Sequence, residues 1–163
     1  YGDYLVEPDF WRGFALMERY NLVSSISAQW PDMVKLRDLA GKFPNVWIVI
    51  DHTGAPQERT PEYFANWQRG MATLAEAENI VCKISGLAMT DNDWTVDSIR
   101  PYVLHCIETF GPDRCIFATN WPVDWIWSTY DKVVDAYREI TSDFSDAERT
   151  AMFAGNSERL YRI

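Results

Sequence analysis

His52 is the residue of this sequence best suited to chemistry near neutral pH. It stands just after the apolar run 46–50, between Asp51 and Gly54. An imidazole in such a place can ligate a divalent metal or act as a general base. The alternative is a structural histidine that only donates a hydrogen bond to a backbone carbonyl at the end of a strand. Asp51 would point to the opposite face of that strand, so we expect it to brace a helix rather than share a site with His52.

A lysine lies near the end of the next apolar run, Ile80 to Ile84, and a serine follows the run directly. Lys83 interrupts this run, and a lysine inside a sheet is costly unless it is paired or reaches the rim. Because side chains alternate along a strand, Lys83 and Ser85 share one face, where both could contact a substrate. The alternative is a lysine whose stem lies along the sheet and whose ammonium reaches solvent at an edge.

The last apolar run is followed by three residues that could form a site, Asn120, Trp121 and Asp124. Asn120 can orient a substrate but cannot act as a base, whereas Asp124 could be the general base if the turn folds it back. Otherwise Asp124 is a solvated loop carboxylate. Pro122 keeps Trp121 extended, which suits the wall of a pocket. Gln29 follows the first apolar run, and we assign it and Trp121 to substrate binding.

The other histidine and the cysteines are not expected to take part in chemistry. His105 falls outside the apolar stripe of its expected helix and should therefore face solvent. The three cysteines follow no C-x-x-C spacing, and a catalytic thiol would need a nearby base. We expect Cys82, Cys106 and Cys115 to be buried free thiols in a reducing cytoplasm.

Four short apolar runs are the candidate strands that position these side chains. The two in the middle are almost continuous in apolar and β-branched residues, which is typical of strands covered on both faces in a parallel sheet. The four runs are Leu22 to Ala28, Val46 to Ile50, Ile80 to Ile84 and Cys115 to Ala118.

Helical periodicity fills the intervals between these runs. Thr60-Pro61-Glu62 has the cap, the first-turn proline and the acidic residue of a helix start. Gly111-Pro112 would end the helix before the last run, and Ser145 to Glu148 is a capping box. Further helices are expected from Pro31 and over 156–161.

The alternation of strand and helix, repeated about every 25 to 35 residues, predicts a parallel α/β layout. Four such units are half of an eight-unit barrel, whose usual size is about 250 residues. The expected fold class is therefore α/β, a partial (β/α)8 TIM-type barrel of about four carboxy-terminal units. An open doubly wound sheet is the alternative, but the G-x-G-x-x-G turn typical of it does not occur. In either architecture ligands bind at the carboxyl ends of the strands.

Composition and charge exclude several classes of function. The 163 residues are 47% hydrophobic and 24% charged, which suits one packed domain. A net charge of −9 opposes binding to nucleic acid and to anionic lipid. No apolar run reaches the roughly 20 residues that span a bilayer. The amino terminus lacks the features of a signal peptide and a starting Met, so we expect an internal cut through a cytoplasmic protein.

Four ordered blocks of sequence carry a family resemblance. They are Ile-Asp-His-Thr-Gly-Ala-Pro at 50–56, Asn-Ile-Val-Cys-Lys-Ile-Ser-Gly-Leu at 79–87, the segment 110–122 with its Ala-Thr-Asn-Trp-Pro end, and 156–162. In this order they resemble the amidohydrolase-related (amidohydrolase 2) family of the amidohydrolase superfamily. This branch includes sugar-acid lactonases and 2-pyrone-4,6-dicarboxylate hydrolase. The resemblance is strong from about residue 43 to the end.

The resemblance implies a distorted (β/α)8 barrel that hydrolyses a C–O or C–N bond of a small-molecule substrate, typically a lactone. His52 would match the family's metal-ligand or substrate-polarising histidine. Asn120 stands where family members usually carry the aspartate that activates the attacking water. This substitution leaves Asp124 as the candidate base.

The resemblance also implies that residues 1–163 are the carboxy-terminal half of the barrel domain. The family's His-x-His pair belongs to its first strand, so a divalent metal (zinc or manganese) would find only His52 here. We expect the isolated piece to be inactive and to form homo-oligomers through exposed strand edges. The alternatives to a hydrolase are a metal-dependent decarboxylase of the same superfamily and a non-catalytic small-molecule-binding barrel.

Overall fold

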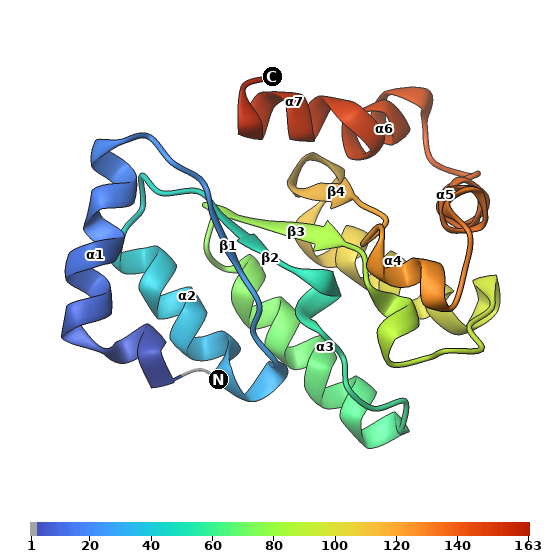
Figure 1. The fold of residues 1–163 in the computed structure, drawn as a ribbon, viewed down its shortest axis with the longest axis horizontal. Coiled ribbons are helices and arrows are strands. Elements are labelled where there is room, and N and C mark those ends of the chain that lie inside the picture. The colour runs from blue at the N-terminus through green and yellow to red at the C-terminus, as the bar shows by residue number, and fades with distance from the viewer. Residues whose placement is uncertain (1–2) are drawn as a thin grey trace.

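Four parallel strands form the sheet at the centre of the protein (Figure 1). The structure is a computed structural model that describes residues 3–163. The strands pair in chain order, and all three pairings are parallel. Each lies within the apolar run expected to form it, so the predicted parallel sheet is confirmed. Their bounds are β1 (Ser24–Ile26), β2 (Ile48–Ile50), β3 (Ile80–Ile84) and β4 (Cys115–Phe117).

Helices alternate with these strands along the chain. A π-helical turn, Ala151–Gly155, joins the last two of them, and short 3-10 turns such as His52–Gly54 and Val123–Ile126 follow the strands. None of the helices in residues 3–163 is both long and apolar enough to cross a membrane. The α-helices are α1 (Pro8–Arg19), α2 (Met33–Lys42), α3 (Pro61–Ala75), α4 (Val96–Phe110), α5 (Tyr130–Ile140), α6 (Asp146–Thr150) and α7 (Asn156–Tyr161).

Local capping chemistry explains where the helices begin and end. The Thr60 hydroxyl accepts a hydrogen bond from the Tyr63 amide (3.2 Å), and Ser145 and Glu148 form a reciprocal capping box. Gly111 has a φ of 79° and ends α4, because a residue without a Cβ tolerates this conformation. These features confirm the expected start of α3, the expected end of α4 and the expected start of α6. The helices α1 and α5 are not predicted from the sequence.

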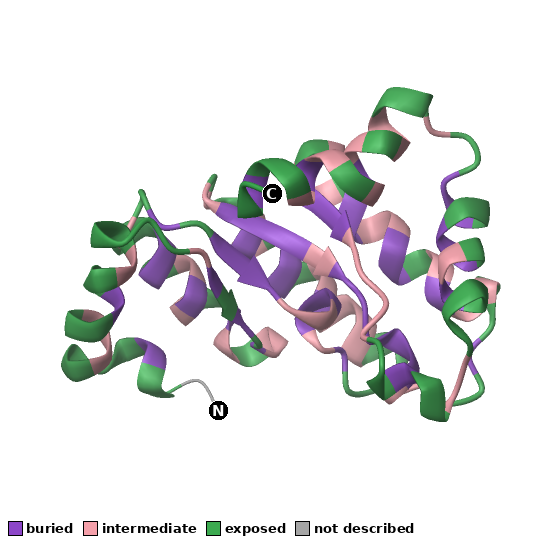
Figure 2. Ribbon diagram, turned by 45° about the horizontal axis from the view of Figure 1, so that its top comes forward, coloured by how far each residue is buried: buried purple, intermediate pink, exposed green. Residues whose placement is uncertain are grey.

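The two faces of the sheet pack against different parts of the chain. On one face Ile50 and Ile80 join the main core, which also contains the buried residues of α2, α3 and α4. On the other face Val49 and Val81 pack against Leu160 of α7. The strands are therefore covered on both sides, and Figure 2 shows most of the sheet in the buried colour. This arrangement is that of a partial (β/α)8 barrel, in which helices cover the outer face.

A buried asparagine ties α7 to the start of β4. The Asn156 amide nitrogen donates to the carbonyls of Pro112 (2.7 Å) and Cys115 (2.8 Å). The Arg159 guanidinium donates to the Asp113 carbonyl (2.7 Å). These bonds hold α7 at the amino end of β4, where Leu160 packs on Val49 and Val81 of the sheet. The carboxyl ends of the strands lie away from this contact.

The residues not expected to act in chemistry are at least partly buried. Cys82, Cys106 and Cys115 are buried free thiols, as predicted. The prediction that His105 faces solvent is wrong. Its ring is half-buried, 5.2 Å from the Trp67 ring between centroids. Because α4 packs on α3 along this flank, the buried part of α4 is wider than its apolar stripe indicates.

From the unpaired edge strand β1 we expect isolated residues 1–163 to self-associate. The outer side of β1 pairs with no strand of residues 3–163, and an unpaired edge is a template for another chain. We expect light scattering on isolated residues 1–163 to give a mass that rises with concentration. Ser27→Lys, an exposed position just after β1, should weaken the association, whereas Ser142→Lys, at an exposed position beyond α5, should not. A monomeric mass at every concentration would contradict this expectation.

Candidate active site

The turn after β2 has an unusual backbone that sets the direction of His52. Four successive residues have positive φ values: His52 (52°), Thr53 (58°), Gly54 (66°) and Ala55 (43°). Positive φ is uncommon for residues with a Cβ and is an outlier for a β-branched residue such as threonine. Such conformations persist only where surrounding contacts enforce them, and they cluster at functional sites.

Hydrogen bonds from two other elements hold this turn in place. The Thr53 hydroxyl donates to the Ser85 carbonyl (3.0 Å) and accepts from the Ser85 amide (3.2 Å). The Trp67 indole of α3 donates to the Thr53 carbonyl (2.8 Å). Thr53 is 0% exposed, so water does not compete for these bonds. The turn after β2 is thus fixed to the end of β3 and to α3.

The His52 imidazole is half-buried against the end of β3. Its Nδ1 lies 3.0 Å from the Ser85 hydroxyl, and its ring packs directly on Gly86, where a Cβ would come within 2.7 Å of Nδ1. Burial lowers the pKa of His52 below its ordinary value of 6.5. The carboxylates of Asp51 and Asp124 oppose this change in the His52 pKa, and Lys83 adds to it.

An ion pair occupies the sheet face opposite α2, α3 and α4. The Lys83 ammonium pairs with the Asp51 carboxylate, and both oxygens of Asp51 lie 2.8 Å from the Ser25 hydroxyl, which donates to the carboxylate. The side chains of Lys83 and Asp51 are only 23% and 17% exposed. The expectation that Asp51 braces a helix is therefore wrong, because it joins the neighbouring strands β1 and β3 instead. Of the interpretations of Lys83, the structure shows the paired lysine.

The turn after β4 folds its carboxylate inward. Asp124 is 2% exposed, and the Asn120 amide nitrogen donates to its Oδ1 (2.8 Å). Burial raises the pKa of Asp124 above its ordinary value of 3.8, while the Asn120 hydrogen bond and the nearby His52 act to lower it. The solvated loop carboxylate considered from the sequence is therefore excluded. The Asp124 carboxylate raises the pKa of His52 and the imidazole lowers that of Asp124, so each group lies within range of the other's charge.

The two remaining sequence-predicted residues also follow the carboxyl ends of strands, at the same edge of the sheet. Trp121 is 40% exposed and packs edge-to-face on Tyr130, with 5.9 Å between ring centroids. Gln29 is half-buried and precedes the 3-10 turn Trp30–Asp32. Within residues 3–163, neither side chain is hydrogen-bonded to His52 or Asp124. Their assignment to substrate binding stays a prediction.

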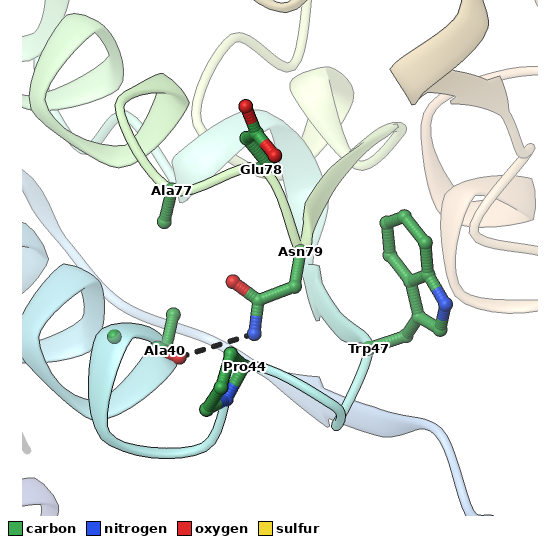
Figure 3. Close-up of a pocket in the computed structure, with 7 residues that line it drawn as sticks. Ala40, Pro44, Trp47, Ala77, Glu78 and Asn79 are labelled. Carbon is green, nitrogen blue, oxygen red and sulfur yellow. Dashed lines mark hydrogen bonds between the residues drawn. The ribbon is translucent and has the colours of Figure 1, made fainter.

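A pocket at the opposite edge of the sheet does not have the chemistry of an active site. It has a volume of about 400 Å³ and is lined by residues such as Ala40, Trp47 and Asn79, at the amino ends of β2 and β3 (Figure 3). The Asn79 amide nitrogen already serves three carbonyls, those of Ala40, Phe43 and Val46. In a parallel α/β fold the amino ends of strands serve stability rather than catalysis. The candidate site is therefore the His52–Asp124 edge.

The described residues do not provide a complete metal site. Throughout residues 3–163, no group of three or more His, Cys, Asp or Glu side chains is placed to hold a metal ion. A catalytic zinc site needs about three protein ligands. His52 offers Nε2, but Asp124 is held by Asn120 and the Asp51 carboxylate by Lys83. A metal at this edge would need ligands from outside the described residues.

Comparison with known proteins identifies the family. A family model described as amidohydrolase matches residues 2–163. The chain belongs to the amidohydrolase family. This membership confirms the resemblance carried by the four sequence blocks, and the partial barrel agrees with it.

Relatives of this amidohydrolase chain are longer than the chain itself. It is 43% identical over 166 residues to the uncharacterized protein y4mH of Sinorhizobium fredii, covering 98% of the chain and 56% of that protein. It is 29% identical over 170 residues to an L-fucono-1,5-lactonase of Burkholderia multivorans, covering 96% of the chain and 57% of the lactonase. A zinc-bound amidohydrolase from Burkholderia multivorans shares its fold with a TM-score of 0.91 at 25% identity, over 98% of this chain and 59% of that one. The chain thus spans less than two thirds of each.

The burial of Asp124 predicts how the stability of this amidohydrolase chain depends on pH. Because its folded-state pKa is raised above 3.8, the ionised carboxylate costs stability at neutral pH, and that cost disappears as the pH falls below 3.8. Asp124→Asn keeps the hydrogen bond from Asn120 and removes the charge. We expect it to unfold at a higher urea concentration than wild type at pH 7 and at a similar one near pH 3.5. Asp93→Asn, in an exposed loop, is the control, and a destabilised Asp124→Asn at pH 7 would contradict the analysis.

Proposed function

We propose that the protein is a hydrolase that opens a lactone or a related cyclic ester or amide by attack of activated water. One observation carries the proposal. A buried carboxylate, Asp124, is oriented by Asn120 and follows a strand whose carboxyl end lies at the same edge of the parallel sheet as His52. In barrels of this kind the catalytic groups come from the ends of several strands.

In the proposed reaction Asp124 is the general base. Its oxygen takes a proton from a water molecule, and the water oxygen attacks the carbonyl carbon of the substrate. The ring C–O bond then breaks, and the leaving oxygen takes the proton back from Asp124. A carboxyl group whose pKa is raised by burial is a better proton acceptor than a solvated one. Asn120 keeps one oxygen of Asp124 engaged and leaves the other for the water.

His52 is the proposed electrophilic group. Its Nε2 side is directed away from Ser85, and we assign it to polarising the substrate carbonyl or to ligating a divalent metal. Zinc or manganese, when bound, would supply positive charge for the developing oxyanion. Because residues 3–163 provide too few ligands, the other ligands would come from a part of the protein that precedes this chain. Lys83, Gln29 and Trp121 are the proposed substrate contacts.

The names of two curated relatives support hydrolysis. Two curated relatives are named L-fucono-1,5-lactonase, and the chain aligns with 57% and 44% of their lengths. The proposal therefore concerns the full-length protein, of which residues 1–163 would form the carboxy-terminal half of the barrel domain. We infer that this piece alone is inactive, because half of a barrel mouth leaves the substrate incompletely enclosed.

Replacement of the proposed base tests the reaction. Asp124→Ala should lower kcat/KM of the full-length protein for L-fucono-1,5-lactone by about 10²- to 10⁴-fold, since general-base catalysis is lost. Asp143→Ala removes an exposed carboxylate distant in sequence and should leave the rate unchanged. Ring opening is followed as acid release. Undiminished activity in Asp124→Ala would exclude Asp124 as the base.

The same assay separates the alternative functions. Release of carbon dioxide from a carboxylated substrate without ring opening would identify a decarboxylase. An inert wild type that gains lactone-opening activity through Asn120→Asp would identify a binding barrel that has lost its base. We expect neither result, because Asp124 already supplies a buried carboxylate beside Asn120.

A further inference from the structure

The two nitrogens of the His52 ring have different surroundings. Nδ1 lies 3.0 Å from the Ser85 hydroxyl. No protein atom of residues 3–163 is hydrogen-bonded to Nε2. An imidazole held at one nitrogen by a protein hydroxyl presents the other nitrogen to whatever enters the site. Because a hydroxyl can donate or accept, the direction of the bond at the held nitrogen decides the tautomer.

We propose that Ser85, clamped by Thr53, is a positioning residue that fixes the tautomer of His52. In this arrangement Nδ1–H donates to the Ser85 hydroxyl oxygen, and Nε2 keeps its lone pair free at the mouth of the site. The proposal rests on the proposed function in one respect, because a free lone pair on Nε2 is what ligation of a metal requires.

The Ser85 hydroxyl is well placed for this task because the backbone that carries it is held by Thr53. The residue is 1% exposed, and the Thr53 hydroxyl bonds both its amide and its carbonyl. Thr53 directly follows His52 in the chain. Ser85 is thus bonded to two consecutive residues of one turn, and its backbone cannot move away from that turn without breaking all three hydrogen bonds.

The packing on Gly86 restricts the orientation of the ring further. A Cβ on this residue would come within 2.7 Å of Nδ1 and 3.0 Å of Cγ, so the imidazole lies directly against the backbone. Gly86 also has a φ of 67°, which side chains with a Cβ rarely adopt. A flipped ring would place a carbon beside the Ser85 hydroxyl and leave a buried hydroxyl without this bond, which is unfavourable.

The conformation of Thr53 is the second observation that points to positioning. A β-branched residue at a φ of 58° is unfavourable. Its hydroxyl nevertheless makes the two bonds to Ser85, and the Trp67 indole secures its carbonyl. Glycine or asparagine would adopt this backbone at lower cost but would not supply the same hydroxyl. The strained residue is therefore explained by the clamp that it forms.

This inference gives Ser85 a role different from the substrate contact expected from its sequence position. The single oxygen of this hydroxyl is already engaged with His52, so it is poorly placed to meet a substrate as well. It acts through the imidazole instead. Lys83, on the same strand face, keeps its separate partner Asp51.

The test is nitrogen-15 NMR of the imidazoles in the full-length protein, after removal of metal with a chelator. The spectra are recorded at about pH 8, where histidines with ordinary or lowered pKa values are neutral. The His52 signals are assigned by their loss in His52→Gln, and His105 is the internal reference. We expect wild-type His52 to carry its proton on Nδ1. Ser85→Ala should shift the population toward the form with the proton on Nε2, and Ser85→Thr should restore the wild-type pattern.

Further variants and outcomes make the test decisive. Thr53→Val keeps the shape of the side chain but removes the clamp, and it should shift the His52 tautomer without changing the His105 signals. Ser27→Ala, an exposed serine after β1, should change neither histidine. If Ser85→Ala does not fold, Ser85→Cys, with its weakly hydrogen-bonding thiol, should give the same shift. A proton on Nε2 in wild type, or an unchanged tautomer without the Ser85 hydroxyl, would overturn the proposal.

The outcome is independent of the lactonase assay. A fixed tautomer in a protein without hydrolase activity would remove the proposed function and leave the positioning role intact. Hydrolase activity with an unfixed tautomer would remove the positioning role and leave the proposed function intact.

Discussion

The parallel pairing of the four strands determines where each polar group of the candidate site can lie. β2, β3 and β4 pair in parallel, with Ile84 of β3 beside Phe117 of β4, so the carboxyl ends of the three strands point to one edge of the sheet. His52 and Asp124 follow two of these ends, although 71 positions separate them in the sequence. An antiparallel neighbour would carry its polar end to the opposite edge. The meeting of imidazole and carboxylate is thus a consequence of backbone hydrogen bonding.

The sheet face that α7 partly covers changes from apolar to polar along the strands. Its apolar part stabilises the fold, and its polar part lies beside the candidate site. Near the amino ends, Val49 and Val81 are closed by Leu160 of α7. One step toward the carboxyl ends, Asp51 and Lys83 form their ion pair, with Ser25 bonded to the same carboxylate. Charges in a largely buried position are expensive, and their pairing makes them tolerable. They also place fixed charges next to His52, whose pKa responds to both.

The sequence predicts the features that local patterns encode and misses those that depend on distant contacts. The continuous apolar run ending at Ile50 and the cap at Thr60 each reflect short-range chemistry, and both are confirmed. The alternation of side chains along a strand places Asp51 and His52 on opposite faces. It does not reveal which residues of other elements each of these side chains contacts. The left-handed turn at Thr53 has no local signature, since its stabilisation comes from Ser85, 32 positions later. The half-burial of His105 likewise depends on how closely α3 and α4 approach.

The central claim is that the His52 imidazole and the Asp124 carboxylate open onto the same mouth. NMR titration of His52 in the metal-free protein, compared between wild type and Asp124→Asn, measures this directly. The carboxylate favours the imidazolium, so the pKa of His52 should be lower in Asp124→Asn than in wild type, while that of His105 stays the same. A His52 pKa that does not change on removal of the Asp124 charge would show that the two groups do not share a site.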